Sequence, residues 1–185
     1  MEDQHSAPVT VLILPGLGGS GPQHWQSLWQ DAEPSFQRVE QADWDNPDRA
    51  AWIANLETAA RAAEGPIVLV AHSLACPLVA LWAKHGTVAA VRGAMLVAPP
   101  DLDSADRVPV EAAGFGPMPL DPLPFPSVVV ASSDDPYAEL GRTRAFASGW
   151  GSEFIDIGPC GHINTESGFG DWPRGLEILA GLIGK

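Results

Sequence analysis

The stretch Val68-Leu-Val-Ala-His-Ser-Leu-Ala75 decides how the rest of the chain is interpreted. Its first four residues form an apolar run without polar alternation, which predicts a strand buried on both faces of a parallel sheet. The residues from Leu74 onward predict a helix. A serine at the sharp turn between such a strand and a helix is typical of a nucleophile elbow, which needs small residues two positions to either side. Ala71 and Ala75 occupy these positions, where glycine is usual.

Strands and helices alternate along the rest of the chain. Apolar runs flanked by turn residues predict six strands, at residues 9–14, 36–40, 66–70, 91–97, 127–131 and 153–157. The segments between them predict helices at 22–32, 47–64, 74–85, 137–150 and 172–183. This alternation predicts an α/β fold, a doubly wound and mostly parallel six-stranded sheet with helices on both faces. The proline-rich segment 98–126 is expected to cross the carboxyl edge of the sheet as an ordered loop.

Two helix boundaries carry local signals. Pro47 predicts the first turn of the second helix, in which Trp52, Leu56 and Ala60 fall on one stripe. Gly86 predicts a left-handed end to the third helix.

The elbow motif alone has a second interpretation, in which Ser73 only caps the helix that follows. A nucleophilic serine also needs a base within hydrogen-bond reach and an acid that orients the base. In this architecture the acid and then the base follow the serine, each just beyond the carboxyl end of a strand. The segments SSDDPY at 132–137 and GPCGHIN at 158–164 meet that requirement. We therefore expect a catalytic triad of Ser73, Asp135 and His162.

Three aspartates are candidates for the acid. Asp135 is favoured because Pro136 fixes the turn behind it and directs the preceding carboxylate back across the sheet edge. Asp134 could instead cap a turn or face solvent. Asp101 follows the fourth predicted strand, a position that some enzymes of this architecture use for the acid.

Two backbone N–H groups are expected to form an oxyanion hole. One is that of Leu74, directly after the serine, and the other is that of Leu17 in the glycine-rich loop 15–21. This loop does not match a phosphate-binding loop, because it lacks a following Lys-Ser or Lys-Thr pair and the G-x-G-x-x-G spacing. His24 follows the loop and could reach the site, although a lone histidine there is more often structural. Together with Trp25 it is a candidate for the substrate pocket.

Composition excludes several function classes. A chain of 185 residues fits one domain, with residues 1–8 as a flexible tail. The net charge of −13 repels phosphate backbones and anionic membranes, so neither nucleic acid nor membrane is expected as a partner. No signal peptide or membrane span is visible, which favours a cytoplasmic protein. No cluster of His, Cys and carboxylate residues has metal-ligand spacing, so no metal or other cofactor is expected.

Four segments carry a resemblance to a known family. They are PGLGGSGPQHWQSLW at 15–29, VLVAHSLA at 68–75, SSDDPY at 132–137 and GPCGHIN at 158–164. With them the chain resembles the retinoblastoma-binding protein 9 and YdeN family of small serine hydrolases over nearly its whole length. The resemblance implies a compact α/β-hydrolase fold without a large lid. It also implies a Ser-Asp-His triad, which falls on Ser73, Asp135 and His162, and Ala75 stands where the family usually has glycine.

These observations predict an enzyme that hydrolyses small carboxylic esters, and less readily amides, through an acyl-enzyme. Its partner would be a small ester or acyl substrate, and no protein partner is indicated. The alternative is a binding protein on a hydrolase scaffold that is weakly catalytic or inactive.

Overall fold

The computed structural model describes residues 8–184, so the expected tail at residues 1–8 lies outside the described residues apart from Pro8. Within this range six strands form one sheet in which all neighbouring strands are parallel. In spatial order they are β2 (Phe36–Arg38), β1 (Thr10–Leu14), β3 (Ile67–His72), β4 (Val91–Val97), β5 (Ser127–Ala131) and β6 (Glu153–Asp156). The helices are α1 (Trp25–Ala32), α2 (Arg49–Ala62), α3 (Ala75–Ala83), α4 (Leu140–Trp150) and α5 (Pro173–Ile183), with short 3-10 helices η1 (Val110–Phe115) and η2 (Thr165–Ser167). The predicted doubly wound α/β fold is confirmed.

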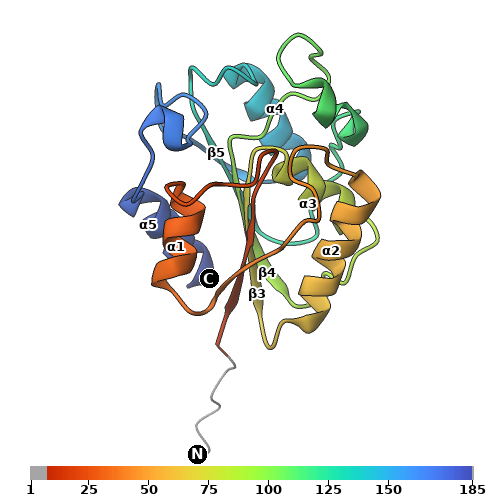
Figure 1. The fold of residues 1–185 in the computed structure, drawn as a ribbon, viewed down its shortest axis with the longest axis vertical. Coiled ribbons are helices and arrows are strands. Elements are labelled where there is room, and N and C mark those ends of the chain that lie inside the picture. The colour runs from red at the N-terminus through yellow and green to blue at the C-terminus, as the bar shows by residue number, and fades with distance from the viewer. Residues whose placement is uncertain (1–7, 185) are drawn as a thin grey trace, which may run out of the picture.

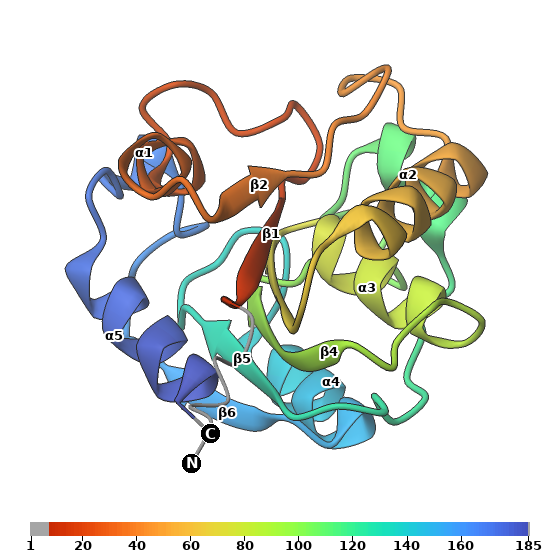
Figure 2. The same cartoon turned by 90° about the horizontal axis from the view of Figure 1, so that it is seen from below.

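Helices cover both faces of the sheet (Figures 1 and 2). α1 and α5 pack on one face, and α2, α3 and α4 pack on the other. In β3, Val68 and Val70 join the core beneath α1 and α5, whereas Ile67 and Leu69 join the core on the opposite face. Successive side chains of a strand point to opposite faces. A strand covered on both sides is therefore apolar at every position, which explains the missing polar alternation.

Both helix boundaries that were predicted from local signals are wrong. α2 begins after Asp48, whose side chain accepts a hydrogen bond from the N–H of Ala51, so Pro47 precedes the cap instead of forming the first turn. After α3, Gly86 does not adopt a left-handed backbone. Its lack of a side chain matters for packing instead, because a Cβ at this position would collide with the indole of Trp82.

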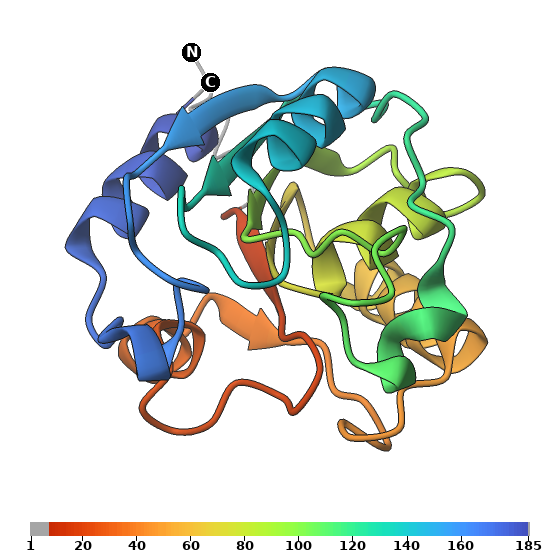
Figure 3. The same cartoon turned by 90° about the horizontal axis from the view of Figure 1, so that it is seen from above.

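The segment 98–126 crosses the edge of the sheet at the carboxyl ends of the strands, and it contains η1 (Figure 3). Arg142 of α4 holds the start of this segment. Its guanidinium donates to the two carboxylate oxygens of Asp101 at 2.7 and 2.9 Å and to Asp103 at 2.8 Å. Asp101 is therefore engaged by a cation of α4, which leaves it unsuited to orient a histidine.

The direction in which strands are added to the sheet reverses at β1. β2 lies on one side of β1 and β3 on the other. The loop after β1 therefore leads away in one direction and the loop after β3 in the other, which opens a crevice between them. Leu14, the last residue of β1, pairs with Ala71, one residue before the end of β3. Open α/β sheets bind their ligands at such a switch point, outside the carboxyl ends of the strands.

Candidate active site

Three side chains from three different loops form a continuous hydrogen-bond chain. The Nε2 atom of His162 lies 2.9 Å from Ser73 Oγ, and its Nδ1 atom lies 3.0 Å from both carboxylate oxygens of Asp135. An ionised carboxylate only accepts hydrogen bonds, so Nδ1 carries the proton and Nε2 is left to accept from the serine hydroxyl. The structure thus brings together the three residues expected from their order in the sequence.

Ser73 occupies a strained turn between β3 and α3. Its φ of 54° lies in the left-handed region, which residues other than glycine rarely adopt. Strain of this kind clusters at functional sites. The N–H of Ser73 donates to the carbonyl of Val97 on β4 at 2.9 Å, which fixes the turn. The N-cap of α3 is Leu74 and has no side-chain cap bond, so the interpretation of Ser73 as a helix cap does not hold.

The two expected oxyanion donors lie beside this turn. Leu17 and Leu74 both line the cavity in front of the serine, and within residues 8–184 neither backbone N–H has an acceptor in the protein. Gly16 allows the two backbones to approach closely. A Cβ on Gly16 would lie 2.9 Å from the carbonyl oxygen of His72 and 3.1 Å from the nitrogen of Leu74.

Asp134, the neighbour of Asp135, ties the loop after β5 to the loop after β6. Its Oδ1 accepts hydrogen bonds from the Ser132 hydroxyl at 2.8 Å and from the Gly161 N–H at 2.7 Å. Ser132 Oγ in turn accepts from the N–H of Cys160 at 2.9 Å. The bonds from Ser132 and Gly161 hold the pKa of Asp134 below its ordinary value. Asp134 therefore supports the segment that carries the histidine and does not contact the histidine ring.

His72, directly before the serine, connects the elbow to the same segment. Its Nε2 lies 2.9 Å from the carbonyl oxygen of His162, so this nitrogen carries the proton and donates. Burial, and then the neighbouring rings of His162 and His24, lower the pKa of His72 well below its ordinary value. The ring is consequently neutral near pH 7. The two bonded residues are 90 positions apart in the chain.

His24 lines the cavity and also caps α1, whereas Trp25 does not reach the cavity. His24 Nδ1 accepts from the N–H of Gln26 at 3.2 Å, and burial followed by the charge of Arg38 lowers the pKa of His24 to about 4. Its proton therefore resides on Nε2, which is buried and has no partner among the described residues. Trp25 is fully buried, and its indole N–H donates to the carbonyl of Ile163 at 2.9 Å. This bond fixes the backbone directly after His162.

These groups border a cavity of about 350 Å³. Ser73 and His162 lie on its wall, and no lysine or arginine of the described residues lines it. Among the described residues, no group of three or more His, Cys, Asp and Glu side chains could hold a metal ion. In the same part of the chain, no helix is long and apolar enough to cross a membrane.

Comparison with known proteins places this chain in a family. The family model for serine hydrolases matches residues 11–181. A protein described as a YdeN-like hydrolase from Pectobacterium atrosepticum is 32% identical, with 94% of this chain and 90% of that chain covered and a TM-score of 0.82. The ydeN gene product from B. subtilis is 19% identical, with 96% and 100% covered and a TM-score of 0.73. The esterase RhEst1 from a Rhodococcus species is 17% identical, with 97% and 92% covered and a TM-score of 0.68. No curated protein matches the chain. The chain therefore belongs to the serine hydrolase family.

Proposed function

We propose that this protein hydrolyses small carboxylic esters through an acyl-enzyme on Ser73, with His162 as the base and Asp135 as the acid that orients it. The observation that carries the proposal is the unbroken chain of contacts from Ser73 Oγ through the His162 ring to the Asp135 carboxylate. This chain ends at the wall of a cavity large enough for a small ester.

In the acylation step, Ser73 Oγ attacks the carbonyl carbon of the ester and its proton passes to His162 Nε2. Asp135 stabilises the imidazolium that results. The carbonyl oxygen becomes an oxyanion, which in this proposal is bound by the N–H groups of Leu17 and Leu74, two residues that line the cavity. The bond from carbon to the alcohol oxygen then breaks. His162 gives its proton to that oxygen, so the alcohol leaves as a neutral molecule.

In the deacylation step, a water molecule attacks the carbonyl carbon of the acyl-enzyme and gives a proton to His162. The bond from the carbonyl carbon to Ser73 Oγ breaks, and the proton returns to Oγ as the carboxylic acid leaves. Esters are favoured over amides in this proposal because an alcohol is the better leaving group. Neither step needs a cofactor, because serine, histidine and water supply every proton and electron pair.

A fluorophosphonate probe tests whether Ser73 is an activated nucleophile. The native protein should be labelled and should turn over p-nitrophenyl butyrate, whereas Ser73→Ala should lose labelling and about 10⁶-fold in kcat. Ser133→Ala is a matched control, because it removes an exposed hydroxyl from the loop that carries Asp135. Equal labelling of Ser73→Ala and native protein would assign the nucleophile to another residue. A native protein that is neither labelled nor active on the ester would favour a binding protein on a hydrolase scaffold.

A further inference from the structure

The cavity has two unlike sides. One side is apolar and is formed by residues before and within η1; we call it the apolar wall, and it consists of Pro100, Val108, Pro109 and Ala112. The other side is formed by the segment that follows His162; we call it the polar wall, and it consists of Asn164, Thr165 and Glu166. η1 and η2, which carry parts of these walls, lie on opposite sides of the sheet edge in both views (Figures 1 and 3).

The direction of proton transfer assigns one wall to each part of the ester. The histidine that takes the serine proton must deliver it to the alcohol oxygen, so the leaving alcohol lies on the His162 side of the carbonyl carbon. The polar wall lines the same cavity and begins two residues after His162 in the chain, so we assign it to that side. The acyl group then extends toward the apolar wall. Four apolar residues there can bury a short hydrocarbon chain away from water, which favours its binding.

The charge on the lining is of one sign. Glu166 is the only carboxylate on the lining, it is exposed, and within residues 8–184 it forms no ion pair. His24 and His72 also line the cavity, but burial lowers the pKa of each ring, so both are neutral near pH 7.

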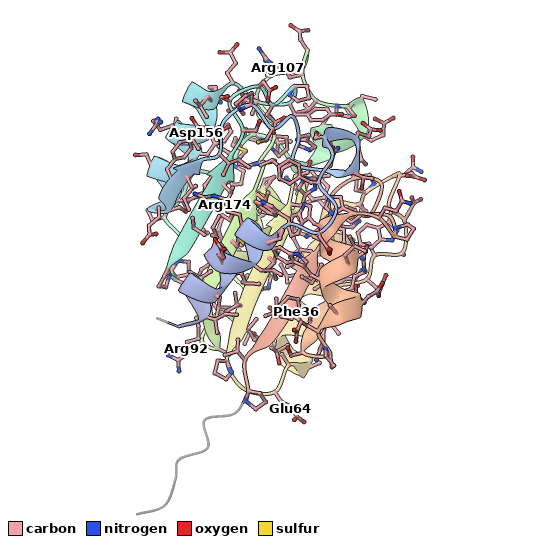
Figure 4. All side chains as sticks on the ribbon, turned by 90° about the vertical axis from the view of Figure 1, so that its left-hand side faces the viewer. Phe36, Glu64, Arg92, Arg107, Asp156 and Arg174 are labelled. Carbon is pink, nitrogen blue, oxygen red and sulfur yellow. The ribbon has the colours of Figure 1, made fainter. Side chains whose placement is uncertain are left out.

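Arg38, at the carboxyl end of β2, is a cation near the cavity, and its charge contributes to the lowered pKa of His24. It donates to the Ser20 carbonyl and the Ser27 hydroxyl and does not itself line the cavity. Arg107 is next to the apolar wall in the sequence and is labelled at the upper tip of the molecule in Figure 4, but it pairs with Glu139 at 2.7 Å. The imidazolium that forms on His162 during the reaction is paired with Asp135.

We propose that the polar wall is the leaving-group subsite, and that it selects esters of short apolar acids with cationic alcohols over esters with anionic alcohols. This inference rests on the hydrolysis proposed above. Its physical basis is the carboxylate of Glu166, which has no ion pair within residues 8–184 and lies beside the departing alcohol, on a lining to which this part of the chain contributes no lysine or arginine. An anionic leaving group would meet this carboxylate in a protein whose net charge is already −13.

Three butyryl esters test the subsite. They share the acyl group and differ in the charge of an alcohol of similar size: butyrylcholine, 3,3-dimethylbutyl butyrate and 3-(butyryloxy)propane-1-sulfonate. For each ester, kcat/KM is measured with native protein, Glu166→Gln and Glu166→Lys. The readout for each protein is kcat/KM on the cationic ester divided by kcat/KM on the neutral ester. The intrinsic reactivity of the esters cancels when this ratio is compared between proteins. Glu177→Gln on α5 is the control, since it removes the same charge beside a different pocket.

The ratio of kcat/KM for the cationic ester to that for the neutral ester should fall about three- to five-fold in Glu166→Gln, the effect expected of one exposed charge pair. It should fall further in Glu166→Lys. The anionic ester should be the poorest substrate of native protein and should improve in Glu166→Lys. Added salt should lower the ratio of native protein, because salt screens exposed charges. The ratio of Glu177→Gln should match that of native protein.

Failure of this inference differs from failure of the proposed function. If all three esters are hydrolysed through Ser73 but the ratio is the same in native protein, Glu166→Gln and Glu166→Lys, the leaving-group assignment is overturned and ester hydrolysis stands. An equal fall of the ratio in Glu177→Gln would also overturn it, because the overall charge would then be the cause. If native protein hydrolyses p-nitrophenyl butyrate but none of the three esters, this inference is overturned and ester hydrolysis stands; if it hydrolyses none of the four and is not labelled, both proposals are overturned.

Discussion

At the scale of single residues, Asp134 and Asp135 are neighbours with different tasks. Asp135 contacts the ring nitrogen of His162, whereas Asp134 accepts from Ser132 and Gly161. Asp135→Asn should lower kcat by about 10³- to 10⁴-fold, because an amide favours the wrong imidazole tautomer. Asp134→Asn keeps an oxygen acceptor for both donors and should cost little. Asp134→Ala loses both bonds and should cost roughly ten-fold or less.

Steady-state kinetics on a p-nitrophenyl ester separates these three variants. Equal losses in Asp135→Asn and Asp134→Asn would show that the two carboxylates share the orienting role. A larger loss in Asp134→Asn would move the acid one residue upstream.

The sequence was sufficient to predict the order Ser73, Asp135, His162, because each follows a recognisable strand and the architecture constrains that order. It was not sufficient to predict the contacts that support them. The bond from His72 to the His162 carbonyl joins residues 90 apart, and the bond from Gly161 to Asp134 joins residues 27 apart. Side-chain to backbone bonds of this range depend on the relative placement of two loops, which no local pattern specifies.

At the scale of elements, the strands were easier to predict than the helices. The ranges 91–97 and 127–131 match β4 and β5, because a strand buried on both faces is a continuous apolar run with clear ends. The helices begin later than predicted. α1 begins at Trp25 and not at residue 22, since His24 caps it, and α4 begins at Leu140 and not at residue 137, after the cap residue Glu139. Apolar periodicity does not reveal where a turn ends and a helix begins.

The close contact between the loop after β1 and the elbow after β3 gives a prediction at this scale. Gly16→Ala would place a methyl group 2.9 Å from the His72 carbonyl and 3.0 Å from Ser73 Cβ, so the two segments must separate. Displacement of the oxyanion donors by about 1 Å can cost on the order of 100-fold in rate. We expect a loss of this size in kcat/KM, measured on a p-nitrophenyl ester.

Gly21→Ala is the matched control for this prediction. It lies in the same loop and lines the same cavity, but a Cβ there meets nothing within 4 Å. Gly21→Ala should retain most of the activity. If Gly16→Ala is as active as Gly21→Ala, the loop can shift without cost and the proposed oxyanion geometry is wrong.

At the scale of the whole molecule, the buried histidines link the stability of the fold to pH. Burial lowers the pKa of His24 to about 4 and that of His72 well below its ordinary value. Above pH 6.5 both rings are neutral in the folded and the unfolded chain, so they contribute no pH dependence. Below pH 6.5 the unfolded chain binds protons that the folded chain does not. The free energy of unfolding should therefore fall as pH decreases from 6.5 toward 4, by up to about 1.4 kcal/mol per pH unit for each ring.

His24→Asn isolates one of the two rings, because asparagine can replace the cap bond to Gln26 but does not titrate. Urea unfolding of His24→Asn is measured at several pH values between 6.5 and 4.5. The slope of its unfolding free energy against pH should be shallower than that of native protein, by the contribution of up to one bound proton. Both proteins have the same carboxylates, so the difference between their slopes belongs to the histidine. His85→Asn is the control, since His85 is exposed. Equal slopes for His24→Asn and native protein would mean that His24 accepts a proton in the folded state as readily as in the unfolded chain, which its burial beside His72 and Arg38 should prevent.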